Sequence, residues 1–501
     1  MPIQFFNSLG RKKEVFQPIE KNRVKIYSCG PTVYASPHIG NFRAFIFADL
    51  LRRSLEFLGF AVESVMNITD VGHLVSDSDS GEDKMEKSAA AQKIHPLEIA
   101  RKYEKEFLDD LAKLNIETPT HLPRASEHIS EQVGLIKTLE KKGFTYTTSD
   151  GIYFDTSKFT DYGKLSGQKI EDKAAGARVE IRDEKKNPAD FALWKFCVGE
   201  NAYHILRWPN PNGQGEGFPG WHIECSAMSM KYLGKNIYKK EASDGAGLVG
   251  SATEREPHGG EADGGAREGV SPSRSEAIFD IHTGGVDHIP VHHENEIAQS
   301  EAATGKKFVN FWLHNEFLTV DGGKMSKSLG NLFTLNDLAQ KGFEPLAFRY
   351  FCLNSNYRGK LNFSWEALQN AQNSLQKLRT EFQKLPDGKI DAAEIEKFGA
   401  TLADDLNSPR ALAVVWDYLK NPKANQATIL KFDAALRLDL AKVENEKIEI
   451  SPEVQKLLDE RAAARAKKDF QKSDEIRDAL AEMGFEIEDA KSGEQILKKK
   501  N

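Results

Sequence analysis

The chain has 501 residues, of which 40% are hydrophobic and 29% are charged, and this balance is typical of a globular protein with two or three domains. Its formal net charge of −7 provides no general attraction to nucleic acid, although a local basic face can still bind phosphates. It contains neither eighteen uninterrupted apolar residues nor a basic and apolar leader, so we expect a cytoplasmic protein that does not enter a membrane.

The first predicted elements form the start of a doubly wound sheet. Residues 24–29 predict a buried parallel strand, and residues 42–57 have the apolar spacing of a helix packed on a sheet. The loop between them lies at a strand's carboxyl end and a helix's amino end, where open α/β sheets bind ligands and free N–H groups favour phosphate. With a second strand over residues 61–68, the pattern predicts an α/β catalytic domain of Rossmann type.

The middle of the chain predicts an insertion into this sheet. Helical periodicity covers residues 96–145, and short strands are predicted at 151–155 and 192–196. Residues 239–275 are rich in Gly, Ser, Glu and Arg and have too few large apolar side chains to offset their ordering entropy, so we expect a mobile surface loop. The sheet pattern returns at residues 278–281.

Helical patterns dominate beyond residue 345, as in residues 365–378 and 407–416. Residues 454–483 predict a charged helical pair, followed by a strand over 484–488. The predicted organisation is a catalytic domain at 1–345 with a connective insertion at about 115–200, a helical bundle at 346–450 and a small module at 451–501.

Two motifs suggest a nucleotide site. His38-Ile-Gly-Asn41 is a weak signal by itself, but at the start of a helix Gly40 lets an adenine ring approach the backbone and His38 can donate to a phosphate. In the second motif, residues 321–331, Lys324 and Lys327 place two ammonium groups on a glycine-hinged loop that can swing onto a triphosphate. A solvated basic loop is the default for two lysines, and the co-occurrence with the first motif favours the ATP site.

Several residues are potential metal ligands. The four cysteines are too scattered for a disulfide framework; we interpret Cys197 and Cys352 as inert buried thiols. His292 and Glu296 are four residues apart and project from one helix face. Together with Cys29 and Cys225 they make a set of two thiolates, one imidazole and one carboxylate, which suits zinc. From the residues alone the set stays open, because other imidazoles are near in sequence: His222, His282, His288 and His293.

The two nucleotide motifs resemble the signatures of the class I aminoacyl-tRNA synthetases, a His-Ile-Gly-His-like element and a Lys-Met-Ser-Lys-Ser loop. The loop is matched in full at residues 324–328, whereas Asn41 replaces the last histidine and keeps a hydrogen-bonding side chain without a charge. Three further segments, at residues 29–34, 220–228 and 292–300, make the chain resemble the cysteinyl-tRNA synthetase family over nearly its whole length.

The resemblance implies an enzyme that activates L-cysteine with ATP to cysteinyl-adenylate and transfers it to the 3′ end of tRNA(Cys). It implies one Zn²⁺ per chain that recognises the substrate thiol, Mg²⁺ with ATP, and a monomer. The implied zinc ligands are Cys29, Cys225, His292 and Glu296. The implied cysteine pocket is Gly30, Thr69, Trp221 and Asp287. The implied ATP-binding residues are His38, Gly40, Asn41, Lys324, Ser326 and Lys327, of which His38, Asn41, Lys324 and Lys327 are also catalytic.

Two alternatives belong to other functional classes. An ATP-dependent ligase of the same ancestry could join activated cysteine to an amino sugar, but such enzymes lack the C-terminal tRNA module that residues 461–480 resemble. A zinc-stabilised RNA-binding protein without catalysis would not need Lys324 and Lys327 on a glycine-hinged loop. In the module we expect a basic helical surface, formed by Arg461, Arg465, Lys467, Lys468 and Lys472.

Overall fold

The structure is a computed structural model of the chain. It describes residues 2–71, 83–168, 184–234, 238–240, 246–248, 277–323, 325, 329–442, 451–467, 469–489 and 495–499. The chain divides into two compact units, residues 1–440 and 441–501. Among the helices of the described segments, none has the length and apolar character required to cross a bilayer.

A four-stranded parallel sheet lies at the centre of the first unit, with strand order β13-β12-β3-β4. The strands are β3 (Arg23–Ser28), β4 (Ala61–Met66), β12 (Phe279–Gly285) and β13 (Val309–Asn315). The two middle strands and β13 are almost wholly buried, as is usual for a parallel sheet covered on both faces. The predicted strands and the predicted Rossmann-type sheet are therefore confirmed.

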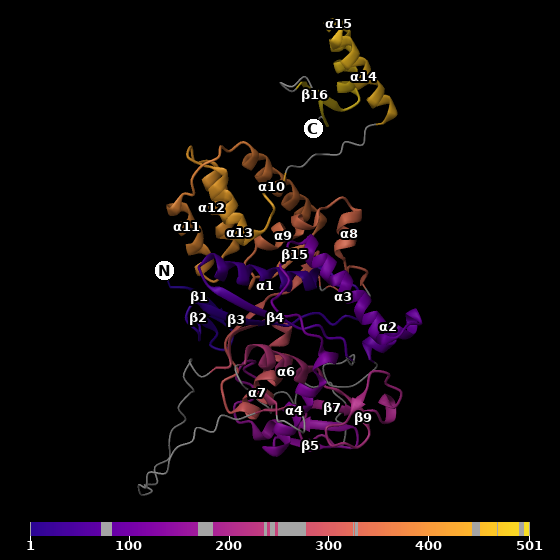
Figure 1. Ribbon diagram of the computed structural model, residues 1–501, viewed down its shortest axis with the longest axis vertical. Coiled ribbons are helices and arrows are strands. Elements are labelled where there is room, and N and C mark those ends of the chain that lie inside the picture. The colour runs from indigo at the N-terminus through magenta and orange to yellow at the C-terminus, as the bar shows by residue number, and fades with distance from the viewer. Residues whose placement is uncertain are drawn as a thin grey trace. The chain divides into compact units, whose positions relative to one another are not determined.

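Two crossover connections leave the middle of this sheet in opposite directions. Helix α1 (Ile39–Phe57) lies between β3 and β4, and α7 (His292–Thr304) lies between β12 and β13. Because such crossovers are right-handed, the two helices cover opposite faces, and Figure 1 shows α1 and α7 on different sides of the sheet. The strand order reverses between β3 and β12, and ligands bind at such a switch point.

The segment between β4 and β12 contributes to both faces of the sheet, because its first two helices share the apolar core of α1 and the rest of it packs with α7. Its helices are α2 (Lys84–Gln92), α3 (Pro96–Lys113), α4 (Ile129–Lys141) and α6 (Trp221–Leu233). Its antiparallel sheet has the order β5-β6-β7-β9-β8, with strands β5 (Thr145–Thr147), β6 (Gly151–Phe154), β7 (Phe191–Phe196), β8 (Trp208–Pro209) and β9 (Glu216–Pro219). The strands predicted at 151–155 and 192–196 are confirmed. The sheet runs past residue 200, and the insertion boundaries of 115 and 200 stay predictions.

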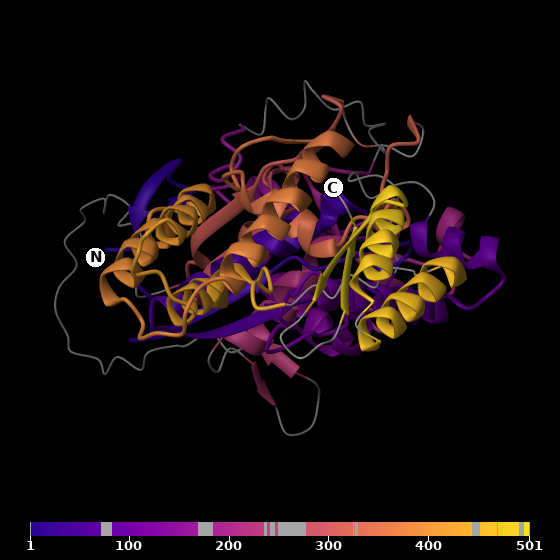
Figure 2. The ribbon, with the colours of Figure 1, turned by 90° about the horizontal axis from the view of Figure 1, so that it is seen from above.

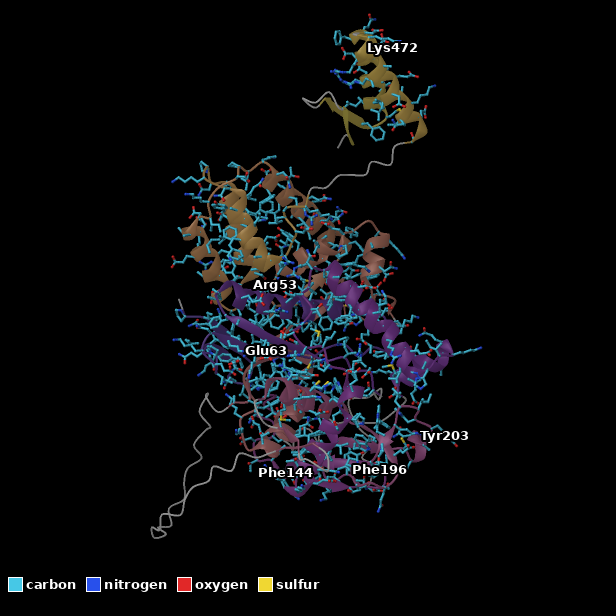
Figure 3. The ribbon with its side chains drawn as sticks, in the orientation of Figure 1. Arg53, Glu63, Phe144, Phe196, Tyr203 and Lys472 are labelled. Atoms are coloured by element: carbon cyan, nitrogen blue, oxygen red, sulfur yellow. The ribbon has the colours of Figure 1, made fainter. Side chains whose placement is uncertain are left out.

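One apolar core joins this insertion to the sheet. Phe144 stacks on Phe154, and Phe154 stacks on Phe191; the same core contains Ile297 of α7. Figure 3 locates Phe144 and Phe196 in the insertion and Tyr203 at its outer margin. Cys197 in this region is only half-buried, so its predicted burial is wrong; it follows the last residue of β7, where the chain leaves the sheet.

Helices cover the opposite, α1 face. They are α9 (Pro345–Leu353), α10 (Trp365–Gln383), α11 (Ala392–Ala403), α12 (Ser408–Leu419) and α13 (Gln426–Leu436), and they share one apolar core with α1. The helices predicted at 365–378 and 407–416 are confirmed, and Cys352 is buried as predicted. These helices belong to the same compact unit as the sheet, and the domain boundaries at 345 and 450 stay predictions.

The second unit is a helical pair with a two-stranded sheet. Its elements are α14 (Pro452–Ala466), α15 (Phe470–Glu482), β16 (Phe485–Asp489) and β17 (Gln495–Lys499), and Figure 2 shows the two helices beside the antiparallel strands. The predicted helical pair and strand are confirmed.

The expected basic surface of this unit needs one correction. Arg461 is fully buried, because it lies two helical turns after the core residue Val454 and shares its face of α14. Lys467 and Lys472 are exposed, Arg465 is half-buried, and Lys468 lies outside the described residues.

Most of the predicted mobile loop at 239–275 also lies outside the described residues. At its start, β10 (Tyr238–Lys240) pairs antiparallel with β11 (Ala246–Leu248).

Candidate active site

Three strand ends meet at the switch point of the sheet. Cys29 directly follows β3, and its N–H donates to the Thr283 carbonyl of β12 at 3.2 Å. Thr69 comes shortly after β4 and forms an isolated bridge with Thr32. Asp287 follows β12 and is exposed. Since the carboxyl ends of parallel strands share one edge, residues far apart in sequence are brought together here.

Two packed helices bring further side chains to this edge. Trp221 is the first residue of α6, and Cys225 lies one turn later and is buried. His292 is the first residue of α7, and Glu296 follows one turn later on the same helix face, also buried. The two helices lie against each other, so Cys225 and His292 come close although 66 residues, 226 to 291, lie between them in the sequence.

The ligand types form two overlapping groups, each with its donor atoms within 4.8 Å of one another. The first group is Cys29, Cys225 and His292; the second is Cys29, His282, His293 and Glu296. The ligand set predicted from the sequence therefore spans both groups. Glu296 is the member that lies between them, because its Oε2 is 3.2 Å from His282 Nε2 and 3.6 Å from His292 Nε2.

The electrostatics of this cluster suit a cation. Burial raises the pKa of the Cys29 thiol well above its usual range, and the nearby Cys225 and Glu296 raise it further. Glu296 Oε2 is buried and, although it lies near His282, it has no partner with hydrogen-bond geometry within the described part of the chain. Thiolates and a carboxylate this close repel one another unless a positive charge lies between them. The residues therefore fit a bound metal ion.

Imidazoles surround the cluster. Cys29 Sγ lies 3.2 Å from His293 Nε2, His293 Nδ1 lies 2.7 Å from His314 Nε2, and His314 Nδ1 lies 2.7 Å from Ser8 Oγ. Burial lowers the pKa of His293 and His314 well below the ordinary value, so both are neutral near pH 7. The sequence reasoning missed His314, which lies near the end of β13, a strand that was not predicted.

The Trp221 indole stacks on the His292 ring, with 4.3 Å between the ring centroids. Of the two residues that we predict to line the cysteine pocket here, Trp221 is half-buried and Thr69 is buried.

The sequence reasoning also missed the hydrogen-bond partners of Thr69. Its hydroxyl donates to Glu224 Oε2 at 3.1 Å and accepts from Asn67 Nδ2 at 3.0 Å. Asn67 Oδ1 in turn accepts from the N–H of Gly30 at 2.9 Å. The available sequence signal for these hydrogen bonds was Glu224, an ionisable residue whose neighbours in α6 are buried, as it is itself.

The first nucleotide motif forms the start of α1. His38 is the N-cap residue, and its N–H donates to Asn41 Oδ1 at 3.1 Å, which closes the first turn of the helix. A Cβ atom added to Gly40 would lie 3.0 Å from the His38 ring and 3.2 Å from Met325 Sδ. Met325 belongs to the second motif, so the structure brings the two motifs together. Lys324, Ser326 and Lys327 lie outside the described residues.

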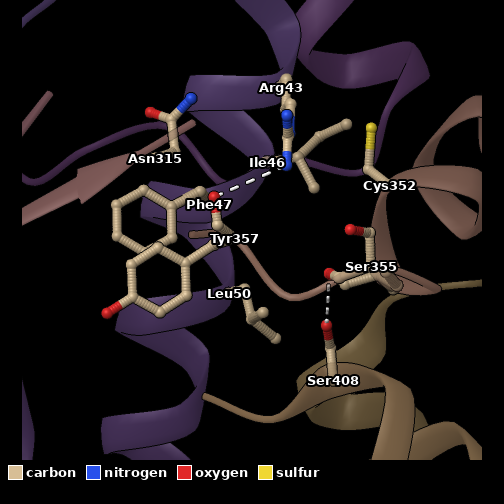
Figure 4. A pocket seen from close by; sticks show the side chains of 10 residues that line it. Arg43, Ile46, Phe47, Leu50, Asn315, Cys352, Ser355, Tyr357 and Ser408 are labelled. Atoms are coloured by element: carbon tan, nitrogen blue, oxygen red, sulfur yellow. Dashed lines mark hydrogen bonds between the residues drawn. The ribbon is translucent and has the colours of Figure 1, made fainter. Parts of the chain in front are cut away.

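Arg43 secures the backbone around this region. Its guanidinium donates to the carbonyls of Phe317, Tyr357 and Gly359, and Figure 4 shows it beside Tyr357 and Asn315 at a small cavity. The cavity holds about 20 Å³, which is room for one water molecule. It is too small for a nucleotide, so we assign it no part in substrate binding.

Comparison with known proteins agrees with this geometry. Residues 15–248 and 272–373 match the family described as tRNA synthetases class I (C) catalytic domain, and residues 448–496 match the cysteinyl-tRNA ligase anticodon binding domain. The chain is 43% identical to cysteine–tRNA ligase 1 of Burkholderia lata, over 99% of this chain and 97% of that protein. The chain belongs to the cysteine–tRNA ligase family.

Other relatives give the same family. A cysteine–tRNA ligase of Treponema denticola is 42% identical and covers 100% of both chains, and one of Thermus thermophilus is 37% identical over 98% of each. A solved structure of Mycobacterium tuberculosis methionyl-tRNA synthetase in complex with methionyl-adenylate superposes with a TM-score of 0.51 at 15% identity, covering 83% of this chain and 88% of that one. That likeness confirms the class I fold, and the family confirms an aminoacyl-tRNA ligase.

Proposed function

We propose that the chain activates L-cysteine with ATP and transfers the cysteinyl group to the 3′ end of tRNA(Cys). The observation that carries this proposal is the convergence of Cys29, Cys225 and His292 at the strand ends, next to the loop that leads to His38. The names of the relatives support cysteine and tRNA as substrates, and the matched anticodon binding domain supports tRNA.

The donor set supports one zinc ion per chain. Cys29, Cys225, His292 and Glu296 are the proposed ligands, because thiolate and imidazole select against the harder cations. When bound, zinc supplies a Lewis acid that accepts the thiolate of cysteine far better than the hydroxyl of serine. A site that recognises a group by a specific strong bond discriminates by about 10⁴ to 10⁵, so the proposal needs no editing domain.

The chemistry consists of two substitutions. The cysteine carboxylate attacks the α-phosphorus of ATP and pyrophosphate leaves; a hydroxyl of the terminal ribose of tRNA then attacks the carbonyl carbon and AMP leaves. Neither step needs a protein nucleophile. Catalysis comes from in-line positioning and from compensation of charge on the phosphate oxygens, for which we propose His38, Lys324 and Lys327, with Mg²⁺ accompanying ATP.

The remaining proposed roles divide by position. The proposed ATP site also includes Gly40, Asn41 and Ser326, together with His38, Lys324 and Lys327. Asn41 is proposed as a catalytic residue as well, from its place in the first turn of α1. Gly30, Thr69, Trp221 and Asp287 bind the cysteine substrate.

Cysteine-dependent ATP–pyrophosphate exchange without tRNA tests the first step. Zinc-replete protein should show exchange with cysteine and not with serine, and absence of exchange with cysteine would contradict the proposal. Charging of tRNA with labelled cysteine tests the second step. Transfer to an amino sugar in place of tRNA would favour the alternative ligase, which no comparison supports.

We also propose a cytoplasmic monomer that uses no membrane. Light scattering during size-exclusion chromatography should give one chain per particle, 56.0 kDa, and a stable dimer would contradict this. Cell fractionation should recover the protein without membranes.

A further inference from the structure

We propose that Asn67 and Glu224 are positioning residues that orient the Thr69 hydroxyl and the Gly30 backbone toward the substrate. This inference rests on the proposed function, because Thr69 and Gly30 matter here as parts of the cysteine pocket. It adds two residues that do not touch the reacting atoms but decide which hydrogen bonds the pocket can offer.

A single chain of hydrogen bonds carries the inference. It runs from the Gly30 N–H to Asn67 Oδ1 at 2.9 Å, from Asn67 Nδ2 to Thr69 Oγ1 at 3.0 Å, and from Thr69 Oγ1 to Glu224 Oε2 at 3.1 Å. Asn67, Thr69 and Glu224 are all buried, so water does not compete with these bonds.

The directions of the first two bonds follow from the Gly30 N–H, and in the third bond the Thr69 hydroxyl donates to Glu224 Oε2. A backbone N–H can only donate, so the side-chain atom of Asn67 that faces Gly30 must be the carbonyl oxygen. The amide nitrogen of Asn67 then faces Thr69 and donates to it. Because the single hydroxyl proton of Thr69 is directed to Glu224, the hydroxyl can accept a further hydrogen bond but cannot donate one. Among the groups of cysteine, the α-ammonium group is the donor that matches it.

The same chain joins the two cysteine-bearing segments. Gly30 follows Cys29 at the end of β3, and Glu224 precedes Cys225 on α6. A Cβ atom added to Gly30 would lie 1.7 Å from the backbone carbonyl oxygen of Asn67, so the backbones of these two strand ends are in direct contact. The three bonds therefore relate the Cys29 loop to the helix of Cys225 as well as setting Thr69.

The burial of the Glu224 carboxyl is energetically unfavourable, so a purely structural role does not explain this residue. Glu224 is 0% exposed, and its Oε1 has no hydrogen-bond partner among the residues that the structure describes. Burying an acceptor without a partner is unfavourable, and an apolar side chain would fill the same volume at lower cost. Such exceptions in well-packed regions occur where function requires the polar group.

The central variant is Asn67→Asp, which keeps an acceptor for the Gly30 N–H but removes the donor to Thr69. The Thr69 hydroxyl is then free to turn toward residue 67. We expect the KM for cysteine in ATP–pyrophosphate exchange to rise about 10-fold, the equivalent of one hydrogen bond, with the KM for ATP and the zinc content unchanged. Glu224→Gln keeps an acceptor for Thr69 and should retain near wild-type KM, whereas Glu224→Leu should raise it.

A double-mutant cycle separates this role from simple loss of stability. Thr69→Val removes the hydroxyl, so adding Asn67→Asp to Thr69→Val should raise the KM for cysteine no further. The matched control is Asp190→Asn, which alters a buried carboxylate that accepts from Thr156 and Tyr146 in the insertion; its thermal midpoint should fall while its KM for cysteine stays constant.

Two results have different meanings. A wild-type chain with no cysteine-dependent exchange overturns the proposed function itself. An active wild type in which Asn67→Asp leaves the KM for cysteine unchanged, or in which the two substitutions act additively, overturns the positioning role alone. If Glu224→Leu does not fold, Asn67→Asp and Glu224→Gln still decide the question.

Discussion

Arg349 and Asp49 form an ion pair that is withdrawn from solvent, with 2.5 Å between Nη2 and Oδ2 and side chains that are 0% and 1% exposed. The pair joins α9 to α1, the helix that begins with the first nucleotide motif. The other donors of Arg349 bond the carbonyls of Leu436 and Leu114. One guanidinium therefore connects α9 to the helix whose N-terminus carries the first nucleotide motif.

Removing this guanidinium should destabilise the first unit strongly. Arg349→Met leaves the Asp49 carboxylate buried with Arg53 as its one remaining charged partner among the described residues, and breaking a buried pair in this way costs about 3–5 kcal/mol. Urea unfolding of the full chain, followed by tryptophan fluorescence, measures the loss. The control Lys420→Ala breaks an exposed pair with Asp417 and should change stability by less than about 0.5 kcal/mol. Equal effects of the two substitutions would contradict the assignment.

The two overlapping ligand groups make different predictions for metal affinity. If Cys225 is a ligand and His282 only orients Glu296, Cys225→Ala should lose zinc almost completely, while His282→Ala should weaken affinity by about 10–100-fold, as loss of an outer partner does. Competition with a chromogenic chelator measures both. The reverse order of losses would favour the group Cys29, His282, His293 and Glu296.

Gly30→Ala should disrupt the pocket, because the new Cβ atom would lie 1.7 Å from the Asn67 carbonyl oxygen. The backbones must separate, and overpacking of this kind costs about 1–3 kcal/mol or more. We expect a lower thermal midpoint and a raised KM for cysteine. Gly399→Ala is the control, since its Cβ atom would meet the Phe57 ring at 3.4 Å in a helix; a comparable loss there would argue against a specific clash.

Stability should depend on the titration of His204. Burial lowers the pKa of this imidazole, but hydrogen bonding and charge from Asp83 and the charge of Glu86 outweigh burial and raise the pKa above its ordinary value. The ring is 3.1 Å from Asp83 Oδ2. A raised pKa stabilises the folded state fully below about pH 6.5, and this contribution is lost as the pH rises through the folded-state pKa.

Thermal midpoints of the wild type and His204→Gln test that sign. The difference between them should be larger at pH 6 than at pH 9. A difference that grows with pH would show that the imidazole is held neutral instead.

Lys327→Ala should separate catalysis from metal binding. Loss of one charge-stabilising donor reduces turnover by about 10²–10³-fold, so pyrophosphate exchange should fall strongly while the zinc content stays at the wild-type value. Loss of zinc in this variant would show that our division of roles between the two motifs is wrong.

Local patterns predicted the elements around the site well. The strand at residues 23–28, the helix that follows it and the pair of terminal helices depend on side-chain periodicity, which is written in adjacent residues. The placement of His292 and Glu296 on one helix face followed from their spacing. The prediction that Arg461 lies on the surface was wrong. Its charge suggested exposure, whereas its spacing along α14 places it on the face that packs on the core.

The sequence by itself determined the family, the motifs and the candidate ligand types of this protein, since each depends on contiguous residues. Only the tertiary structure decided which of them meet. Thr69 and Glu224 are 155 residues apart, and Glu296 lies closer to His282 than to His292 because β12 and α7 pack together. Such contacts depend on how helices and strands pack over long separations, which local periodicity does not encode.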